Sequence, residues 1–261
     1  MMAGRRLASL FSGWPATVLA AGGLFSWLSG VPALPTDHEG LCRTETAAGV
    51  GYIVCDIPLD RHRLSLRAVD AAGKPYETFE AVEASLAGRS AELIMNAGMY
   101  HEDRRPVGLT VQDGRAVHGA VLGTGSGNYS LRPNGVFFVE DGRAHVMEST
   151  RYLAGTHHPE LATQSGPMLV VDGELHPRFI ENSDSRHVRN GVCARQDGTV
   201  VTLVLSRASV NFWDFGSFFK DRLGCRDALF FDGTVSSLHY PAGGIDYRRD
   251  RLGPMLVVSD R

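Results

Sequence analysis

Apolar and polar residues follow one another along this chain in patterns that predict mostly β-strands. Residues 50–57 and 62–69 are two successive strand-like segments, and in the second of them apolar and polar side chains alternate. The runs at 93–95 and 229–231 are short and wholly apolar, which is typical of strands buried on both faces. Strands therefore dominate the predicted elements.

Two segments carry apolar side chains at helical spacing instead. Residues 78–86 and 211–223 each present one apolar face, and each is followed closely by a glycine, Gly88 and Gly224, that can end a helix. Together these elements predict an α+β fold, a single domain with mixed or antiparallel β-sheets and a few packed helices.

Asp-Gly dipeptides mark several turns and one different position. Four of them lie between strand-like segments and predict tight hairpins with positive φ: Asp113-Gly114, Asp141-Gly142, Asp172-Gly173 and Asp197-Gly198. The fifth, Asp232-Gly233, follows the apolar run 228–231 and leads toward Ser236 and Ser237. Its carboxylate is expected at the end of a buried strand, where functional groups collect, although a turn role stays open.

The N-terminal segment has the pattern of an export signal. After Arg5 and Arg6 no charged residue occurs until Asp37, and the intervening residues are largely apolar. We expect residues 1–36 to be a signal peptide or an N-terminal membrane anchor, and residues 37–261 to form the functional domain. The expected location is periplasmic or secreted.

Composition and net charge limit the classes of partner and substrate that we expect for this chain. The 261 residues include 26 Lys and Arg against 29 Asp and Glu, and 43% of them are hydrophobic, as in ordinary globular proteins. A net charge of −3 offers no large basic excess for a phosphate backbone, so nucleic acid is not an expected partner. Small anionic substrates remain compatible with local groups of basic residues.

Four cysteines fit an exported chain, because an even number can pair completely in an oxidising compartment. Cys42 with Cys55 and Cys193 with Cys225 is the favoured pairing among three possible connectivities. The first pair flanks a short segment and the second joins neighbouring apolar segments. Their spacing matches no zinc ribbon or finger.

Basic residues gather in Arg186-His187-Val188-Arg189. The planar guanidinium of arginine matches phosphate oxygens, so Arg186 and Arg189 are candidates for a phosphate clamp, with a solvated strand edge as the alternative. His101-Glu102-Asp103 and His157-His158 contain metal-ligand residue types at no standard spacing. We therefore expect neither a metal site nor a cofactor.

Several ordered motifs resemble those of the phosphodiester glycosidase family. They are Asn96-Ala97-Gly98-Met99-Tyr100, Arg105-Pro106-Val107-Gly108-Leu109, Pro133-Asn134-Gly135-Val136-Phe137, Gln164-Ser165-Gly166-Pro167-Met168-Leu169, Arg189-Asn190-Gly191-Val192, and the stretch from Leu223 through Asp232 to Ser237. The resemblance runs from about residue 50 to the C-terminus and is nearest to bacterial envelope members. One departure is Thr234 and Val235, where the family usually has glycines.

The resemblance implies hydrolysis of a sugar 1-phosphodiester in envelope or extracellular glycoconjugates. It implies Asp232 as nucleophile or general base and Arg189 as the group that holds the phosphate. Six further side chains would contact the sugar or the phosphate, although the polar ones also commonly serve in turns and caps: Asn96, Asn134, Ser165, Arg186, Ser236 and Ser237.

Other functions remain open at this point. Thr234 and Val235 in place of glycines favour a non-catalytic module that binds envelope carbohydrate or phosphate. A metal-dependent hydrolase is a second alternative, and a Ser-His-Asp arrangement around Ser236 or Ser237 and His239 is a third. The expected partner in the favoured reading is a sugar-phosphate substrate, with membrane contact only through the N-terminus.

Overall fold

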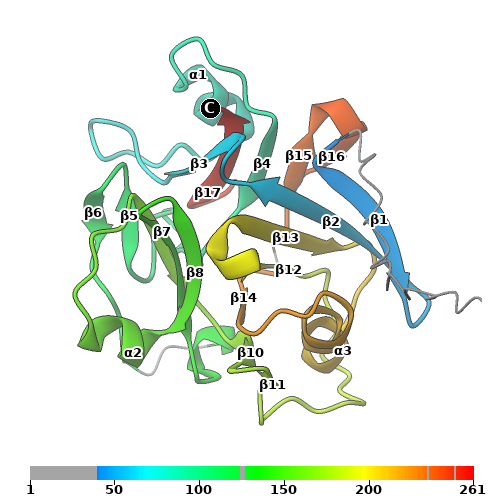
Figure 1. The fold of residues 1–261 in the computed structure, drawn as a ribbon. Helices are drawn as coiled ribbons and strands as arrows, with labels where there is room; N and C mark the ends of the chain where they lie inside the picture. Colours follow the sequence, from blue (N-terminus) through cyan, green and yellow to red (C-terminus); the bar gives the residue numbers. More distant parts are fainter. Residues whose placement is uncertain (1–39, 124–126, 234, 250) are drawn as a thin grey trace, which may run out of the picture. The chain divides into compact units, whose positions relative to one another are not determined.

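A computed structural model describes residues 40–123, 127–233, 235–249 and 251–261 (Figure 1). These residues belong to one unit, Glu39–Arg261. The expected export segment, residues 1–36, lies outside the described residues, and so does Thr234. None of the described helices has the length and apolar composition needed to cross a membrane.

The largest sheet carries the two strands that lead to the candidate site. In the described part of the chain it has seven strands, in the order β1 (Cys42–Ala47), β2 (Val50–Pro58), β13 (Val200–Ser206), β12 (Asn190–Arg195), β14 (Ala228–Phe230), β10 (Met168–Val171) and β11 (Glu174–Leu175). The central strands β12, β13 and β14 are mostly buried, in agreement with the largely apolar sequences of β13 and β14.

Two five-stranded sheets complete the β-structure of the described residues. One has the order β16 (Ile245–Tyr247), β15 (Leu238–Tyr240), β4 (Leu93–Asn96), β17 (Met255–Asp260) and β3 (His62–Arg67). The other has the order β6 (Arg115–His118), β5 (Thr110–Gln112), β9 (Leu161–Ser165), β7 (Gly135–Glu140) and β8 (Arg143–Glu148). All strand pairs in these three sheets are antiparallel.

The helices of the described chain are short. They are α1 (Phe79–Ala84), α2 (Ser149–Ala154) and α3 (Phe212–Ser217), with a π-helical turn η3 (Phe218–Arg222) and the 3₁₀ turns η1 (Gly127–Ser130), η2 (Gln196–Gly198) and η4 (Pro241–Gly243). Thr78 and Asn211 cap α1 and α3 by accepting backbone N–H bonds, as their positions before the apolar stripes predict. The helix expected over 211–223 is thus α-helical only in its first half.

The three sheets share one core. A single cluster of buried side chains includes members of each sheet, such as Leu203 of β13, Leu256 of β17 and Phe137 of β7. On its other face the largest sheet packs against α3 and η3 through Phe215 and Phe219 (Figure 1). The expectation of a single α+β domain with few helices is confirmed, and of the two expected kinds of sheet, mixed or antiparallel, the described sheets are antiparallel.

Disulfides and turns also match the sequence. Cys42 bonds to Cys55 across the β1–β2 pair, and Cys193 of β12 bonds to Cys225, so the favoured pairing is confirmed. The first four Asp-Gly dipeptides all have positive φ at both residues. Asp232 and Gly233 are absent from the positive-φ residues in the described chain, which confirms that this dipeptide is not a tight hairpin.

Candidate functional site

Asp232 and Arg189 lie at the same end of two neighbouring strands. Strands β12 and β14 pair antiparallel with Gly191 opposite Phe230. Continuing this register by two residues at each strand end makes Arg189 and Asp232 opposed backbone positions. The site is therefore built by strand pairing, because the two residues are 43 apart in sequence by their numbering.

The guanidinium of Arg189 is buried without a charged partner. The residue is 1% exposed. Its Nε donates to the Val210 carbonyl at 2.9 Å and its Nη2 to the Ser185 carbonyl at 3.0 Å, while Nη1 is buried with no hydrogen-bond partner. The Phe212 ring covers the guanidinium, with 3.6 Å from Cζ to the ring centroid, and the Phe230 ring lies 5.4 Å away.

The pKa of the Arg189 side chain reflects its burial without a carboxylate. Burial lowers the pKa of Arg189 from 12.5 to about 10, and burial is the one cause of the shift. Among the described residues no carboxylate forms an ion pair with this guanidinium. The side chain is still positively charged at neutral pH, so the fold holds a desolvated cation that lacks an anion.

Two asparagine side chains hold the segment that carries Asp232. Asn96, the last residue of β4, accepts hydrogen bonds at Oδ1 from Asn190 Nδ2 at 2.9 Å and from the Ser237 N–H at 2.7 Å. Its Nδ2 donates to the Asp232 carbonyl at 3.2 Å. Asn190 Oδ1 in turn accepts from the Asp232 N–H and the Ser236 hydroxyl, each at 3.3 Å. These bonds fix the backbone on both sides of Asp232.

The hydroxyls of three serines also form hydrogen bonds to the backbone near Asp232 and Arg189. Ser165 donates to the Phe231 carbonyl at 2.7 Å and the Ser237 hydroxyl donates to a neighbouring carbonyl. The Ser236 hydroxyl, which has one hydrogen to donate, also lies 3.2 Å from the Val188 carbonyl oxygen. All three serines are fully buried. In the described structure these predicted substrate contacts bind backbone and position the Asp232 segment.

Asn134 and Arg186, the two remaining predicted substrate contacts, lie outside the hydrogen-bonded group around Asp232. Asn134 lies against Gly166, where a Cβ would overlap its side chain, and its Oδ1 is buried without a partner. Arg186 is half exposed and pairs with Asp214 at 3.2 Å. The structure brings Asn134 beside the Ser165 segment, whereas Arg186 lies at the surface and does not share the buried environment of Arg189.

The other chemical candidates are paired in ways that argue against catalysis. His239 Nδ1 lies 2.9 Å from Asp246 and its Nε2 lies 3.6 Å from Glu83, so both ring nitrogens face carboxylates instead of a serine hydroxyl. His157 lies 3.2 Å from Glu140, and Asp103 pairs with Arg105. Among the described residues, His239 forms no hydrogen bond with a serine, and the one cluster of side chains that could hold a metal ion includes none of these histidines.

Asn190 and Phe212 also help to build the site, and the sequence alone does not indicate their roles. Asn190 was noted only as part of the Arg-Asn-Gly motif, although its alternation with Arg189 places it on the opposite face of the strand, toward Asn96. Phe212 lies in the segment 211–223, for which the sequence predicts an apolar helical face, and its ring covers the Arg189 guanidinium. Only the long-range pairing of the strands reveals these roles.

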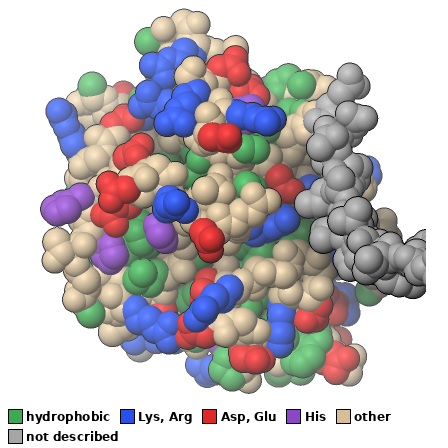
Figure 2. Space-filling model, viewed as in Figure 1, with side chains coloured by type: hydrophobic (Ala, Val, Ile, Leu, Met, Phe, Trp, Pro, Cys, Tyr) green, Lys and Arg blue, Asp and Glu red, His purple; other side chains and the backbone are tan. Residues whose placement is uncertain are grey.

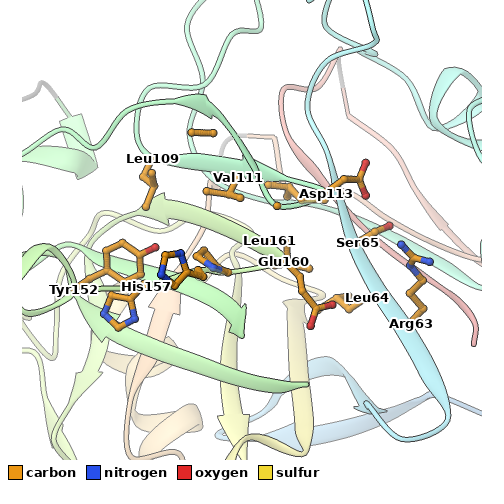
Figure 3. A pocket seen from close by; sticks show the side chains of 15 residues that line it. Arg63, Leu64, Ser65, Leu109, Val111, Asp113, Tyr152, His157, Glu160 and Leu161 are labelled. Atoms are coloured by element: carbon orange, nitrogen blue, oxygen red, sulfur yellow. The ribbon is translucent and has the colours of Figure 1, made fainter. Parts of the chain in front are cut away.

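One surface pocket includes a residue of the candidate site, and a larger groove includes none of its residues. A pocket of about 250 Å³ includes Ser237, Phe79 and Arg249 and so borders the Asp232 segment. A larger groove of about 590 Å³ lies elsewhere, with Tyr152 and His157 toward one end and Arg63 toward the other (Figure 3). None of the predicted catalytic or substrate-binding residues lines the larger groove, so size alone does not mark the site.

Basic and acidic side chains intermingle on the face drawn in Figure 2, and that face has no broad basic surface. This distribution agrees with the net charge of −3. The face drawn in Figure 2 therefore offers no broad basic field to attract an anion.

Comparisons with known proteins fit this architecture. A family model described as phosphodiester glycosidase matches residues 89–253, a range that contains Asn96, Arg189 and Asp232. The chain is 33% identical over 190 residues to the uncharacterized protein YigE of Escherichia coli (strain K12), covering 72% of this chain and 74% of the relative.

Two solved structures share the fold. One is the catalytic domain of zebrafish N-acetylglucosamine-1-phosphodiester alpha-N-acetylglucosaminidase, auto-inhibited by its pro-peptide, with a TM-score of 0.59, 15% identity and coverage of 84% of this chain and 82% of that one. The other is a hypothetical protein from Synechocystis, with a TM-score of 0.55, 14% identity and coverage of 84% and 61%. At such low identity these likenesses establish the fold alone.

Proposed function

Because the chain belongs to the phosphodiester glycosidase family, we propose that it hydrolyses the bond between C1 of a sugar and the oxygen of a phosphodiester. The products are a free sugar and a phosphate monoester. The observation that carries the proposal is the buried, uncompensated guanidinium of Arg189 beside the strand end that bears Asp232.

A desolvated cation of this kind suits an anionic substrate. Nη1 of Arg189 has an unused hydrogen, and the guanidinium fork matches two phosphate oxygens. A phosphodiester that reaches this cation supplies the missing negative charge, and the low dielectric of the site strengthens the attraction. Reaching Nη1 requires a local adjustment, because that atom is buried in the described structure.

The reaction needs little beyond a phosphate clamp and one carboxylate. As the C1–O bond breaks, positive charge develops on the sugar and negative charge on the departing phosphate monoester. The second pKa of such a monoester is about 6, so it leaves without a strong general acid. Arg189 stabilises the departing charge, and Asp232 acts as nucleophile at C1 or as general base toward water.

The buried asparagines and serines then act as the support for Asp232. Their hydrogen bonds hold the backbone of Phe231, Asp232 and Ser237 before substrate arrives, which reduces the reorganisation that the reaction requires. In this proposal Asn96, Asn190, Ser165 and Ser236 are positioning residues, and the pocket next to Ser237 receives part of the substrate.

We further propose that the domain works outside the cytoplasm. Both cysteine pairs are disulfide-bonded, and disulfides persist in oxidising compartments. The charge-poor segment 1–36 would direct export or anchor the chain, and the natural substrate would be an envelope or extracellular glycoconjugate.

The direct test uses the purified domain and a panel of nucleotide-sugars and α-linked sugar 1-phosphodiesters. We expect release of free sugar together with a phosphate monoester from at least one member, and unchanged release in chelator. Saturable binding without sugar release across the panel would instead identify a non-catalytic binding module. Activity that is lost in chelator and restored by added cation would identify a metal-dependent hydrolase.

A further inference from the structure

Three metal-ligating side chains meet at the far end of the sheet that contains β4. His62 begins β3, Glu92 immediately precedes β4, and Asp260 ends β17. One ligand atom from each of them lies within 4.8 Å of the others. None of the three belongs to the site around Arg189 and Asp232.

Strand pairing fixes the backbone of all three residues. His62 and Asp260 are directly opposed in the β3–β17 register. The Glu92 N–H donates to the Val258 carbonyl at 2.8 Å, which anchors Glu92 beside the same strand. Residues on paired strands are held more precisely than residues on loops, so the cluster is preorganised for a small ligand.

The charge of the cluster is unbalanced. Glu92 Oε1 lies 3.1 Å from His62 Nδ1, and Asp260 forms no ion pair with a described residue. Among the described residues, neither carboxylate is paired with a lysine or arginine, although many surface carboxylates of this protein are. With neutral His62 the cluster carries two negative charges, which a divalent cation would neutralise.

From this arrangement we propose that His62, Glu92 and Asp260 form a Zn²⁺ site. Imidazole nitrogen and carboxylate oxygen bind zinc at about 2.0–2.2 Å, which in a tetrahedron separates neighbouring ligand atoms by about 3.4 Å. In this proposal the three ligand atoms, which lie within 4.8 Å of one another, move to that distance when the ion binds. His62 and Glu92 are partly buried and Asp260 is exposed, so solvent completes the coordination.

The zinc is structural and stands apart from the proposed reaction. Glu92 precedes β4 and Asn96 ends it, so the length of this strand, about 13 Å at 3.3 Å per residue, separates the cluster from the frame around Asp232. Zinc at this place joins β3, β4 and the C-terminal strand β17. Its effect is expected on the stability of the sheet, with sugar release unchanged.

The test is zinc titration of the metal-free folded domain by calorimetry, together with thermal unfolding. We expect one site per chain, and a rise in Tm of roughly 5 to 10 °C at a zinc concentration about 100 times the Kd. Replacement by Co²⁺ should give the intense visible absorption of a low-symmetry site, and His62→Asn should remove it.

Matched variants decide between a specific site and general attraction to charge. Asp260→Asn and Glu92→Gln should each weaken zinc binding at least about tenfold, in keeping with loss of one ligand. Asp60→Asn removes an equal charge from an exposed position two residues before His62 and should leave binding intact. The absence of a one-to-one site, or equal effects of Asp60→Asn and Asp260→Asn, would overturn the proposal and leave His62 and Glu92 as a simple ion pair.

Discussion

At the residue scale, Arg189 is the side chain whose surroundings differ most from those of an ordinary surface arginine. Lowering its pKa from 12.5 to about 10 corresponds to a cost of about 3 kcal/mol for holding the charge in the folded protein at neutral pH. The charged guanidinium also contacts the Phe212 ring and donates two hydrogen bonds to carbonyl oxygens. A charge kept at this cost without a carboxylate supports the proposed role of Arg189 in binding an anionic substrate.

Replacing Arg189 therefore separates function from stability. In Arg189→Met we expect loss of sugar release, because the phosphate loses its cation, with a free energy of unfolding no more than about 1 kcal/mol below that of the wild type. Kinetics on a sugar 1-phosphodiester and urea unfolding measure the two effects. Arg186→Met is the matched control, since this surface arginine pairs with Asp214, and it should retain most of the activity.

A different result would assign Arg189 another role. Removing a buried donor so that its acceptor is left unsatisfied typically costs about 1–3 kcal/mol for each acceptor, and Arg189 donates to two carbonyl oxygens. A loss of that size in Arg189→Met would mean that the guanidinium holds the fold together, and its use for substrate would then lack support.

The sequence predicted part of this site at the level of single residues. The apolar run before Asp232 indicated a carboxylate at a strand end, and this position is confirmed. The serines and Asn96 were predicted as substrate contacts, whereas their described bonds go to backbone and to Asn190. Hydrogen-bond partners more than 90 residues apart follow from strand register, which local sequence patterns do not encode.

At the element scale, the Asp-Gly hairpins were predictable because a tight turn with positive φ requires specific residues. Local chemistry of this kind needs no knowledge of the rest of the fold. The second half of the helix at 211–223 was not predictable in the same way. Its apolar spacing fits an α-helix, and the change to a π-helical turn at Phe218 accompanies the packing of Phe218 and Phe219 into the core.

Two of these hairpin glycines make a matched pair. Gly198 and Gly173 both have a φ of +85°, but a Cβ at Gly198 would lie 2.6 Å from the Ala144 carbonyl oxygen, whereas a Cβ at Gly173 would meet nothing within 4 Å. Each of the two substitutions costs about 1 kcal/mol, because alanine must adopt the left-handed backbone conformation. Gly198→Ala should lower the free energy of unfolding by roughly 1–3 kcal/mol more than Gly173→Ala does, because the backbone at Ala144 must shift to make room for the new Cβ.

Chemical denaturation of the two variants provides the comparison. Equal losses of stability would show that the Ala144 strand moves away without resistance, and the close packing of the β12–β13 turn on β8 would then be unimportant. Neither substitution touches the Asp232 segment, so activity of the folded fraction should stay unchanged in both.

At the scale of the whole molecule, the class of fold was predictable and the arrangement of the sheets was not. Many short strands, four hairpin signals and few helices indicated an α+β fold with mixed or antiparallel sheets, and the three described sheets are antiparallel. The strand order joins β4 to β15 and β17, and β12 to β14, across long stretches of chain. Which strands become neighbours depends on burial of the shared core, and alternation of residues alone leaves that choice open.

The disulfides give a prediction for the molecule as a unit. Their sequence separations of 13 and 32 residues correspond to about 3 and about 4 kcal/mol of stabilisation in the loop-entropy model. Cys193→Ala with Cys225→Ala should therefore lower the free energy of unfolding more than Cys42→Ala with Cys55→Ala. Urea unfolding of the two double variants checks the order, and the reverse order would indicate that the loop-length effect does not dominate.

The central claim is that the carboxylate of Asp232 performs the chemistry while Arg189 holds the phosphate. The most direct measurement is the rate of sugar release by Asp232→Asn on a sugar 1-phosphodiester that the wild-type domain cleaves. Asparagine preserves size and backbone hydrogen bonds, so the folded state and substrate binding should persist while kcat falls by at least about 100-fold. A kcat equal to that of the wild type would contradict the mechanism.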